Sequence, residues 1–300
     1  MKYPIRTFHL SKKFRGNTVL EDLCIDVPAG SIYGLVGPSG AGKTTTIKII
    51  MNILQPSAGR SEVLGTGSHR LSPREWSQIG YVSENQEMPD WMTVGYFLEY
   101  WRHFYPTWDS HLAMELARQF RLPLDRKLRH LSRGMCMKAA LASSLAYRPK
   151  LIVFDEPFTG LDALVRDELI EAFLPRAENS TIFLSSHDLA EIETFASHIG
   201  YLENGRLQFS EDLDTLRQRF REVVLTFSTL PKLPPDWPAD WLTPEMSGSV
   251  LRFVDARFSD DRTPDAVRRV FPDVREIAVN GMPLRSIFVS LAKAGRAAAA

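Results

Sequence analysis

The sequence has few cysteines and no long apolar run. Only two of its 300 residues are cysteine, Cys24 and Cys136, and no CxxC spacing occurs. This excludes a zinc knuckle or a disulfide framework and favours a reducing, cytoplasmic compartment. No stretch of about 18 apolar residues occurs, so we expect no membrane-spanning segment. Residues 1–14 also lack the apolar region of a signal peptide.

The sequence also lacks an excess of charge of either sign. It has 36 basic and 36 acidic residues, and its formal net charge is zero. We therefore expect no nucleic-acid partner, because proteins that bind phosphate backbones carry clustered basic residues. The hydrophobic fraction of 44% is ordinary for a folded globular protein. If the protein works at a membrane, we expect it to do so through a partner.

The order of apolar runs predicts two domains. Leu151–Phe154 and Thr181–Leu184 are continuous apolar runs, each followed by a helical pattern, as in a parallel sheet flanked by helices. Before them, alternating short runs predict antiparallel strands. The pattern therefore predicts an α/β domain over residues 1–213, with a helical insert at about 85–149, and a small α+β accessory domain over 214–300.

In the accessory domain, the residue types predict three local features. Five prolines between Pro231 and Pro244 predict an irregular loop or linker. Thr263 followed by Pro264 is typical of an N-cap with proline at the first helical position. The segment 283–292 is expected to be helical.

A glycine-rich segment predicts a phosphate-binding loop. The sequence GPSGAGKT matches the pattern GxxxxGK[ST] between a buried strand and a helix. Glycines let several backbone N–H groups point at one phosphate, and the helix N-terminus adds a partial positive charge. Lys43 is expected at the β- and γ-phosphates of ATP and Thr44 at Mg²⁺. The alternative is a glycine-rich turn with a chance lysine. The expected nucleotide contacts are Gly37, Pro38, Ser39, Gly40, Ala41, Gly42, Lys43, Thr44 and Thr45.

Two acids follow the apolar run at Leu151–Phe154. The carboxyl ends of strands in open α/β sheets are where ligands bind, so these side chains are expected near the phosphate-binding loop. Asp155 suits Mg²⁺, and Glu156 suits the general base that activates water. An apolar run that ends in Asp-Glu is often structural by itself, and the functional interpretation depends on its combination with the loop.

Between these motifs, Leu131–Met135 (LSRGM) resembles LSGGQ, the signature of ATP-binding-cassette (ABC) ATPases. The resemblance covers residues 5 to about 210, with Thr159–Asp162 similar to the D-loop and Ser185–His187 similar to the switch strand. It implies a P-loop NTPase of ABC type, with a mixed sheet core and a helical subdomain. It also implies that two subunits enclose two ATP molecules, so that the signature of each chain faces the P-loop of the other.

The resemblance assigns further roles residue by residue. Phe14 stands where the family stacks an aromatic ring on adenine, although Tyr3 and Tyr33 remain alternatives. His187 stands where the family contacts the γ-phosphate, with a satisfied histidine at a strand end as the simpler interpretation. Ser132 and Gly134 are expected at the phosphate of the second subunit's ATP, and Asp162 is expected to be a contact across the dimer.

The sequence departs from the family pattern at three positions. Met135 and Arg133 differ from LSGGQ, and Arg133 is either a solvated charge or an extra contact to phosphate or to the second subunit. Glu84 stands where the family has the Q-loop glutamine, which helps to hold Mg²⁺ and the attacking water. We therefore expect Glu84 to be catalytic and metal-binding. The alternative is that Gln86 takes this role and Glu84 is a solvated charge.

An apolar stripe at helical spacing, from Val94 through Phe97, Leu98 and Trp101 to Phe104, is predicted to be the core of the helical insert. Tyr96 and Tyr100 lie off the stripe and are candidates for the rim of a groove that receives a membrane subunit.

The C-terminal segment Met282–Phe288 resembles the tail of ATPases that serve ABC-2-type exporters. The sequence therefore predicts an ATP hydrolase that uses ATP and Mg²⁺, pairs with an identical or homologous second subunit, and drives a separate membrane permease at the inner face of the cell membrane. The alternatives are an importer ATPase and, less favoured, an ABC protein outside transport.

Overall fold

The computed structural model describes residues 1–176 and 179–299 of the chain. Two compact units are present, Met1–Ser210 and Glu211–Ala300. They are called the first unit and the second unit here, and each is described by itself.

A six-stranded sheet forms the centre of the first unit. In spatial order its strands are β11 (Arg206–Asp212), β10 (His198–Glu203), β4 (Ile32–Val36), β9 (Thr181–Ser186), β8 (Leu151–Asp155) and β7 (Ile79–Ser83). From β10 to β7 all neighbours are parallel. Every residue of β4, β8 and β9 is buried, which confirms the prediction of buried parallel strands made from their continuous apolar runs.

A second, smaller sheet contains the N-terminal strands. It comprises β1 (Ile5–Phe14), β2 (Asn17–Leu23), β3 (Asp26–Val27), β5 (Ala58–Val63) and β6 (Thr66–Gly67). These strands pair antiparallel, which confirms the prediction for β1, β2 and β3; β5 and β6 were not predicted. One hydrophobic cluster joins both sheets through side chains such as Ile5 of β1, Leu35 of β4 and Ile47 of the helix between them. Burial in this shared cluster fixes the helix against the sheet.

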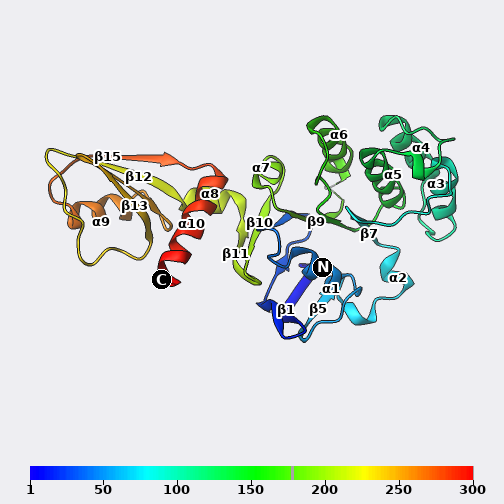
Figure 1. Ribbon diagram of the computed structural model, residues 1–300, viewed down its shortest axis with the longest axis horizontal. Helices are drawn as coiled ribbons and strands as arrows, with labels where there is room; N and C mark the ends of the chain where they lie inside the picture. Colours follow the sequence, from blue (N-terminus) through cyan, green and yellow to red (C-terminus); the bar gives the residue numbers. More distant parts are fainter. Residues whose placement is uncertain (177–178, 300) are drawn as a thin grey trace. The chain divides into compact units, whose positions relative to one another are not determined.

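The first unit has seven α-helices among the described residues. They are α1 (Lys43–Ile50), α2 (Pro73–Trp76), α3 (Val94–Arg102), α4 (Ser110–Gln119), α5 (Arg133–Leu145), α6 (Ala163–Phe173) and α7 (Leu189–Ile192). Helices α3, α4 and α5 form the predicted helical insert, grouped beyond the edge strand β7 (Figure 1), and α5 packs against β7. Side-chain capping by Asp109, whose carboxylate accepts from the N–H of Leu112 at 2.9 Å, starts α4.

The aromatic stripe is only partly core. Val94, Phe97 and Leu98 are buried, as predicted. Phe104 lies beyond the end of α3 and is exposed, so the prediction of a core position is wrong there. The helix ends at Arg102, and past that point helical spacing no longer decides which side chains face the interior.

In its described part, residues 211–299, the second unit comprises a four-stranded antiparallel sheet and three helices. The strands run in the order β13 (Trp241–Ser247), β14 (Val250–Asp255), β12 (Arg221–Phe227) and β15 (Val274–Gly281), and the helices are α8 (Leu213–Arg219), α9 (Arg262–Val270) and α10 (Leu284–Ala299). Its core is aromatic: the rings of Trp241 and Phe253 stack at 4.4 Å, and Phe227 meets Phe271 at 5.5 Å. Such ring pairs add stability beyond the area that they bury.

In the second unit, the predicted irregular loop is confirmed for residues 231–238, but two details of the local predictions are wrong. Thr263 is not an N-cap, because α9 begins at Arg262 after Asp261, and the Thr263 hydroxyl instead donates to buried Asp255 at 2.6 Å. Pro244 lies within β13 rather than in an irregular loop. The pairing of β13 with β14 shifts register between Leu242 and Glu245, and a proline is tolerated at such a bulge because no ladder hydrogen bond is required of it.

Candidate functional site

Four neighbouring parallel strands end at one edge of the six-stranded sheet, and each delivers a predicted site residue there. Gly37 follows β4, His187 follows β9, Asp155 ends β8 with Glu156 directly after it, and Glu84 follows β7. Glu84, Glu156 and His187 line a cavity of about 500 Å³ at this edge. Its wall consists of Val19, Ser39, Gly40, Gly42, Lys43, Thr44, Thr45, Glu84, Glu156, Thr159 and His187.

The predicted phosphate-binding loop has the close backbone packing that requires glycine. A Cβ on Gly37 would lie 2.0 Å from the carbonyl oxygen of Leu202. Gly42 has φ +108°, a left-handed value that favours glycine, and it begins α1 without a side-chain cap. The first N–H groups of α1 are therefore available to a phosphate, which fits the predicted role.

Lys43 is the buried cation of this loop. Its side chain is only 5% exposed, and its Nζ donates to the carbonyl oxygens of Gly37 at 2.7 Å and Pro38 at 3.2 Å. Its Nζ also lies 3.2 Å from Oε1 of Glu156. The lysine thus links the loop to the acid of the neighbouring strand, where its charge can be shared with a bound phosphate.

Thr44 and Asp155 together form a donor set that suits Mg²⁺. The Thr44 hydroxyl donates to Oδ1 of Asp155 at 2.9 Å, and the Ser185 hydroxyl donates to the same oxygen at 2.9 Å. Burial raises the pKa of Asp155, although the hydrogen bonds from Ser185 and Thr44 oppose this effect. The half-buried hydroxyl of Thr44 and the buried carboxylate of Asp155 offer the oxygen ligands that Mg²⁺ prefers, so these residues fit the ion.

Glu156 is held on three sides. Its Oε2 lies 2.8 Å from Nδ1 of His187 and accepts from the Thr159 hydroxyl at 3.2 Å, and its Oε1 faces Lys43. Burial alone would raise the pKa of Glu156, but the hydrogen bond with His187 and the charge of Lys43 outweigh it, so that the pKa is lowered. The carboxylate is therefore ionised near neutral pH and able to accept a proton.

The backbone at Glu156 is unusual. Its φ is +52°, which is left-handed and uncommon for a residue with a side chain. Its N–H donates to the Ser185 hydroxyl at 3.0 Å, which helps to hold this conformation. Such strain is found where the surrounding structure fixes a functional side chain.

Glu84 lies in the cavity wall and Gln86 does not. The N–H of Glu84 donates to the carbonyl oxygen of Asp155 at 3.0 Å, so its position is linked to β8. Its carboxylate pairs with Arg133. The side-chain oxygen of Gln86 is buried and accepts no hydrogen bond in the described structure. This geometry favours Glu84 over Gln86 as the residue that faces a nucleotide.

Eight predicted residues lie outside this wall: Gly37, Pro38 and Ala41 of the loop, Asp155 at the end of β8, and Phe14, Ser132, Gly134 and Asp162. Ser132 caps α5 by accepting from the N–H of Met135 at 3.3 Å, and Asp162 caps α6 by accepting from the N–H of Val165 at 2.9 Å. A Cβ on Gly134 would approach Val165 to 3.1 Å. Phe14 is 43% exposed, with Lys12 Nζ 4.8 Å from its ring centroid.

The structure also adds residues that the sequence did not single out for a role. Val19 of β2 lines the cavity, Thr159 contacts Glu156, and Ser185 holds both Asp155 and the N–H of Glu156. Ser185 and Thr159 belong to family motifs, so the sequence contained a pattern from which their position near the site could have been predicted. Val19 had none, because an apolar residue in a strand carries no chemical signature.

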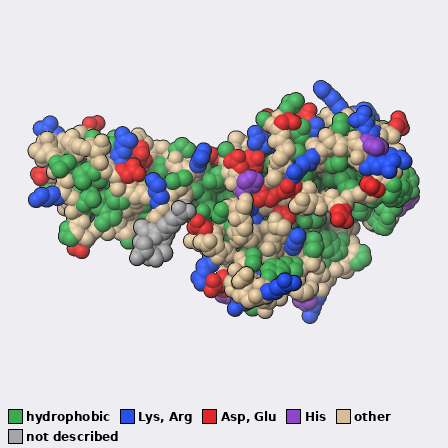
Figure 2. Space-filling view, in the orientation of Figure 1, with side chains coloured by type: hydrophobic (Ala, Val, Ile, Leu, Met, Phe, Trp, Pro, Cys, Tyr) green, Lys and Arg blue, Asp and Glu red, His purple; other side chains and the backbone are tan. Residues whose placement is uncertain are grey.

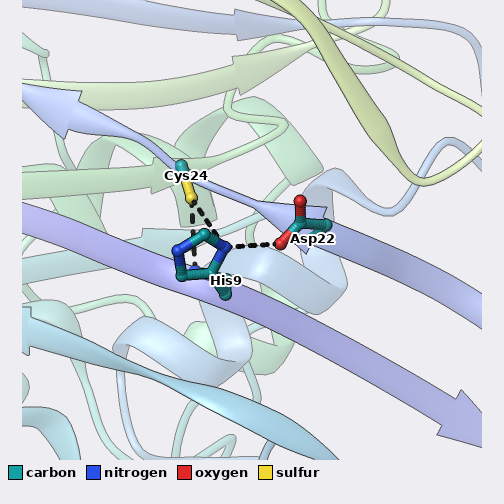
Figure 3. A group of neighbouring side chains, drawn as sticks. All are labelled: His9, Asp22 and Cys24. Carbon is teal, nitrogen blue, oxygen red and sulfur yellow. Dashed lines mark hydrogen bonds and ion pairs between the residues drawn. The ribbon is translucent and has the colours of Figure 1, made fainter.

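A separate cluster of possible metal ligands, formed by His9, Asp22 and Cys24, lies on β1, β2 and the residue after β2 (Figure 3). His9 Nδ1 lies 2.7 Å from Asp22 Oδ1 and 3.8 Å from Cys24 Sγ. All three residues are exposed. Hydrogen bonds among them account for the arrangement without an ion.

Comparisons with known proteins agree with this geometry. A family model described as ABC transporter matches residues 20–159. The ABC transporter ATP-binding protein YtrB of Bacillus subtilis is 34% identical over 223 residues, which cover 73% of this chain and 76% of YtrB. The bacitracin transport ATP-binding protein BcrA of Enterococcus faecalis is 31% identical over 235 residues, covering 75% of this chain and 74% of BcrA. A solved ATP-binding subunit of an ABC transporter superposes with a TM-score of 0.65 at 29% identity and covers 71% of this chain and 92% of its own.

Proposed function

Because the chain belongs to the ATP-binding subunits of ABC transporters and is an ABC-type ATPase, we propose that it powers an ABC-2-type exporter through a separate membrane subunit. The observation that carries the proposal is the convergence of Lys43, Glu156 and His187 on one cavity, with contacts of 3.2 and 2.8 Å to the Glu156 carboxylate. Export is supported by the similarity to a bacitracin transport protein and by the tail motif.

In the proposed reaction, Glu156 accepts a proton from the attacking water. The water oxygen forms a bond to the γ-phosphorus of ATP, and the bond from this phosphorus to the bridging oxygen of ADP breaks. Lys43 and the N–H groups of the loop stabilise the charge on the phosphates, and His187 orients Glu156. Bound Mg²⁺, which Thr44 and Asp155 would hold with Glu84 beside them, neutralises phosphate charge.

We propose that a second cassette, identical or homologous, completes the site. Within this chain Ser132, Gly134 and Asp162 lie outside the described wall of the cavity. Ser132 starts α5, so free N–H groups of that helix remain for a phosphate held by another chain. Hydrolysis would then open the pair of cassettes, which is the motion that a membrane subunit uses.

The proposed contact with the membrane subunit is an aromatic surface on the helical insert. Trp91, Tyr96 and Phe104 are exposed. Hydrophobic side chains gather over this part of the first unit, where α3 lies (Figure 2). Exposed aromatic residues favour protein interfaces. No helix of the described residues is both long and apolar enough to cross a membrane. We therefore propose attachment to the inner face of the cell membrane through the permease, with residues 214–300 as an accessory domain.

The test is to purify the tagged full-length chain from membranes in mild detergent and to identify the integral membrane protein that accompanies it. The expected partner is an ABC-2-type permease, and the yield is expected to fall when Tyr96 is changed to glutamate. Co-purification with a permease that depends on a solute-binding protein would instead assign the chain to an importer. If no integral membrane protein co-purifies with the wild-type chain, the proposed coupling to transport is contradicted.

A further inference from the structure

Arg133 and Glu84 form an ion pair between segments that lie far apart in the sequence. Nη2 of Arg133 donates to Oε1 of Glu84. Arg133 is the first residue of α5, and Glu84 directly follows β7. Both positions depart from the family pattern, since a guanidinium stands in place of a glycine and a carboxylate in place of an amide. The two departures are therefore in direct contact.

The carboxylate of Glu84 stands where added negative charge is unfavourable. Glu84 lines the cavity together with Glu156, and buried Asp155 lies beneath Thr44 in the same site. A nucleotide triphosphate would bring several further negative charges. Like charges in a partly buried site repel more strongly than in water, so an unpaired third carboxylate would weaken nucleotide binding.

The guanidinium of Arg133 is held in place from a second side. A Cβ built on Gly160 would lie 3.0 Å from Nη1 of Arg133, so the side chain packs closely on the loop after β8. The Arg133 side chain is 47% exposed, whereas that of Glu84 is 22% exposed. The arginine is thus the more exposed partner of the pair, and its planar guanidinium suits a fixed carboxylate partner.

We propose that Arg133 is a positioning residue of the nucleotide site, which fixes Glu84 and neutralises its charge. Glu84 then supplies an oxygen at the Mg²⁺ end of the cavity without adding repulsion towards the triphosphate. The ion pair has the same net charge as the glycine and glutamine of the family pattern, so the two departures compensate each other. This inference rests on the proposed function, because it requires that Mg²⁺-ATP occupies the cavity.

The test is a double-mutant cycle on Mg²⁺-ATP binding, measured by calorimetry in a Glu156→Gln background that limits hydrolysis. Arg133→Gln is expected to weaken binding about fivefold, a range that suits a partly exposed charge pair. Adding Glu84→Gln to Arg133→Gln is expected to restore the affinity to within about twofold of the parent. Arg133→Lys, which keeps the charge, is expected to retain most of the affinity.

A matched control removes another arginine from a carboxylate partner away from the cavity. Arg148 pairs with Asp109 at 2.8 Å and has a side chain that is 69% exposed. Arg148→Gln is expected to leave the affinity unchanged. Thermal unfolding of each variant checks that it is folded.

Three outcomes distinguish a failure of this proposal from a failure of the proposed function on which it rests. If the loss caused by Arg133→Gln persists when Glu84 is also glutamine, Arg133 acts directly on phosphate and the proposal is wrong. It is equally wrong if Arg133→Lys loses as much affinity as Arg133→Gln. If the Glu156→Gln parent itself fails to bind Mg²⁺-ATP, the proposed function fails instead.

Discussion

The carboxyl ends of β7 and β8 are neighbours in one sheet, yet the acids that they carry are held differently. Ser83 of β7 pairs in register with Asp155 of β8. Asp155 and Glu156 are held by groups of the sheet and the P-loop, including Ser185, Thr44 and Lys43. Glu84 is held by Arg133, which belongs to the helical insert.

This difference means that the side chain of Glu156 is held more rigidly than that of Glu84. Residues on elements that share one core cannot move apart without loss of packing, so Glu156 keeps its geometry. The backbone N–H of Glu84 is bonded to β8, but its carboxylate is paired with Arg133 of α5. We therefore expect this carboxylate to shift if α5 moves relative to the sheet, and the end of β7 links the nucleotide site to the part of the chain that we propose contacts the membrane subunit.

The largest expected effect comes from Glu156. Glu156→Gln is expected to lower the turnover number for ATP by at least about 100-fold, because the proposed general base is lost while the shape of the side chain is kept. ATP binding should persist, and the closed pair of cassettes should accumulate, as measured by size-exclusion chromatography with ATP. Asp109→Asn, which keeps the oxygen that caps α4 away from the cavity, is the comparison and is expected to leave the turnover number unchanged. Full turnover by Glu156→Gln would rule out the role given to this residue.

Asp155→Asn is expected to raise the stability of the protein and to lower its ATPase activity. Burial raises the pKa of Asp155, so the contribution of this residue to stability is full below its pKa in the unfolded chain and is lost as the pH rises through the folded value. At neutral pH the amide is therefore expected to raise the melting temperature of the protein without nucleotide by about 2–4 °C. Mg²⁺-dependent ATPase activity should fall at least about tenfold, because the proposed metal ligand is lost.

The control for this prediction is the pH dependence of melting. The stabilising effect of Asp155→Asn should disappear at acidic pH, where the Asp155 carboxyl of the wild-type protein is protonated in both the folded and the unfolded chain. A variant that is less stable than the native protein at neutral pH would show that the ionised carboxylate contributes more through its hydrogen bonds than its burial costs.

The smallest expected effect is at Glu84. Glu84→Gln is expected to raise the Mg²⁺ concentration for half-maximal ATPase activity about threefold, since one charged oxygen near the ion is replaced by a neutral one and solvent screens part of the charge. Gln86→Ala is the matched control, because Gln86 lies outside the cavity wall. A shift seen only in Gln86→Ala would transfer the family's Q-loop role to that residue.

Much of the fold could be predicted from the sequence because the signals were local and strong. The buried strands β4, β8 and β9 are continuous apolar runs, and a fully buried parallel strand has no polar face to obscure the pattern. The tail motif also has a structural explanation, because its apolar residues Leu284, Ile287 and Phe288 are buried on α10.

Other features could not be predicted because they depend on competing partners. Thr263 and Pro264 have the residue types of a helix start, but the hydroxyl of Thr263 finds a buried carboxylate and the helix begins earlier. Phe104 continues a helical spacing past the residue where the helix ends. In the first case a tertiary contact, and in the second the end of a helix, overrode the structure that the local residue pattern predicts.

The sequence by itself determined the chemistry of the site: a lysine and a threonine on a glycine loop, two acids after one strand, and a histidine after another. These residue types follow buried strands directly, so the parallel sheet brings them to one edge. Only the tertiary structure decided how Glu84 is used, because its partner Arg133 is separated from it by 49 positions and lies on another element. No local pattern encodes a charge pair between distant segments, since it forms only when the insert packs against the sheet.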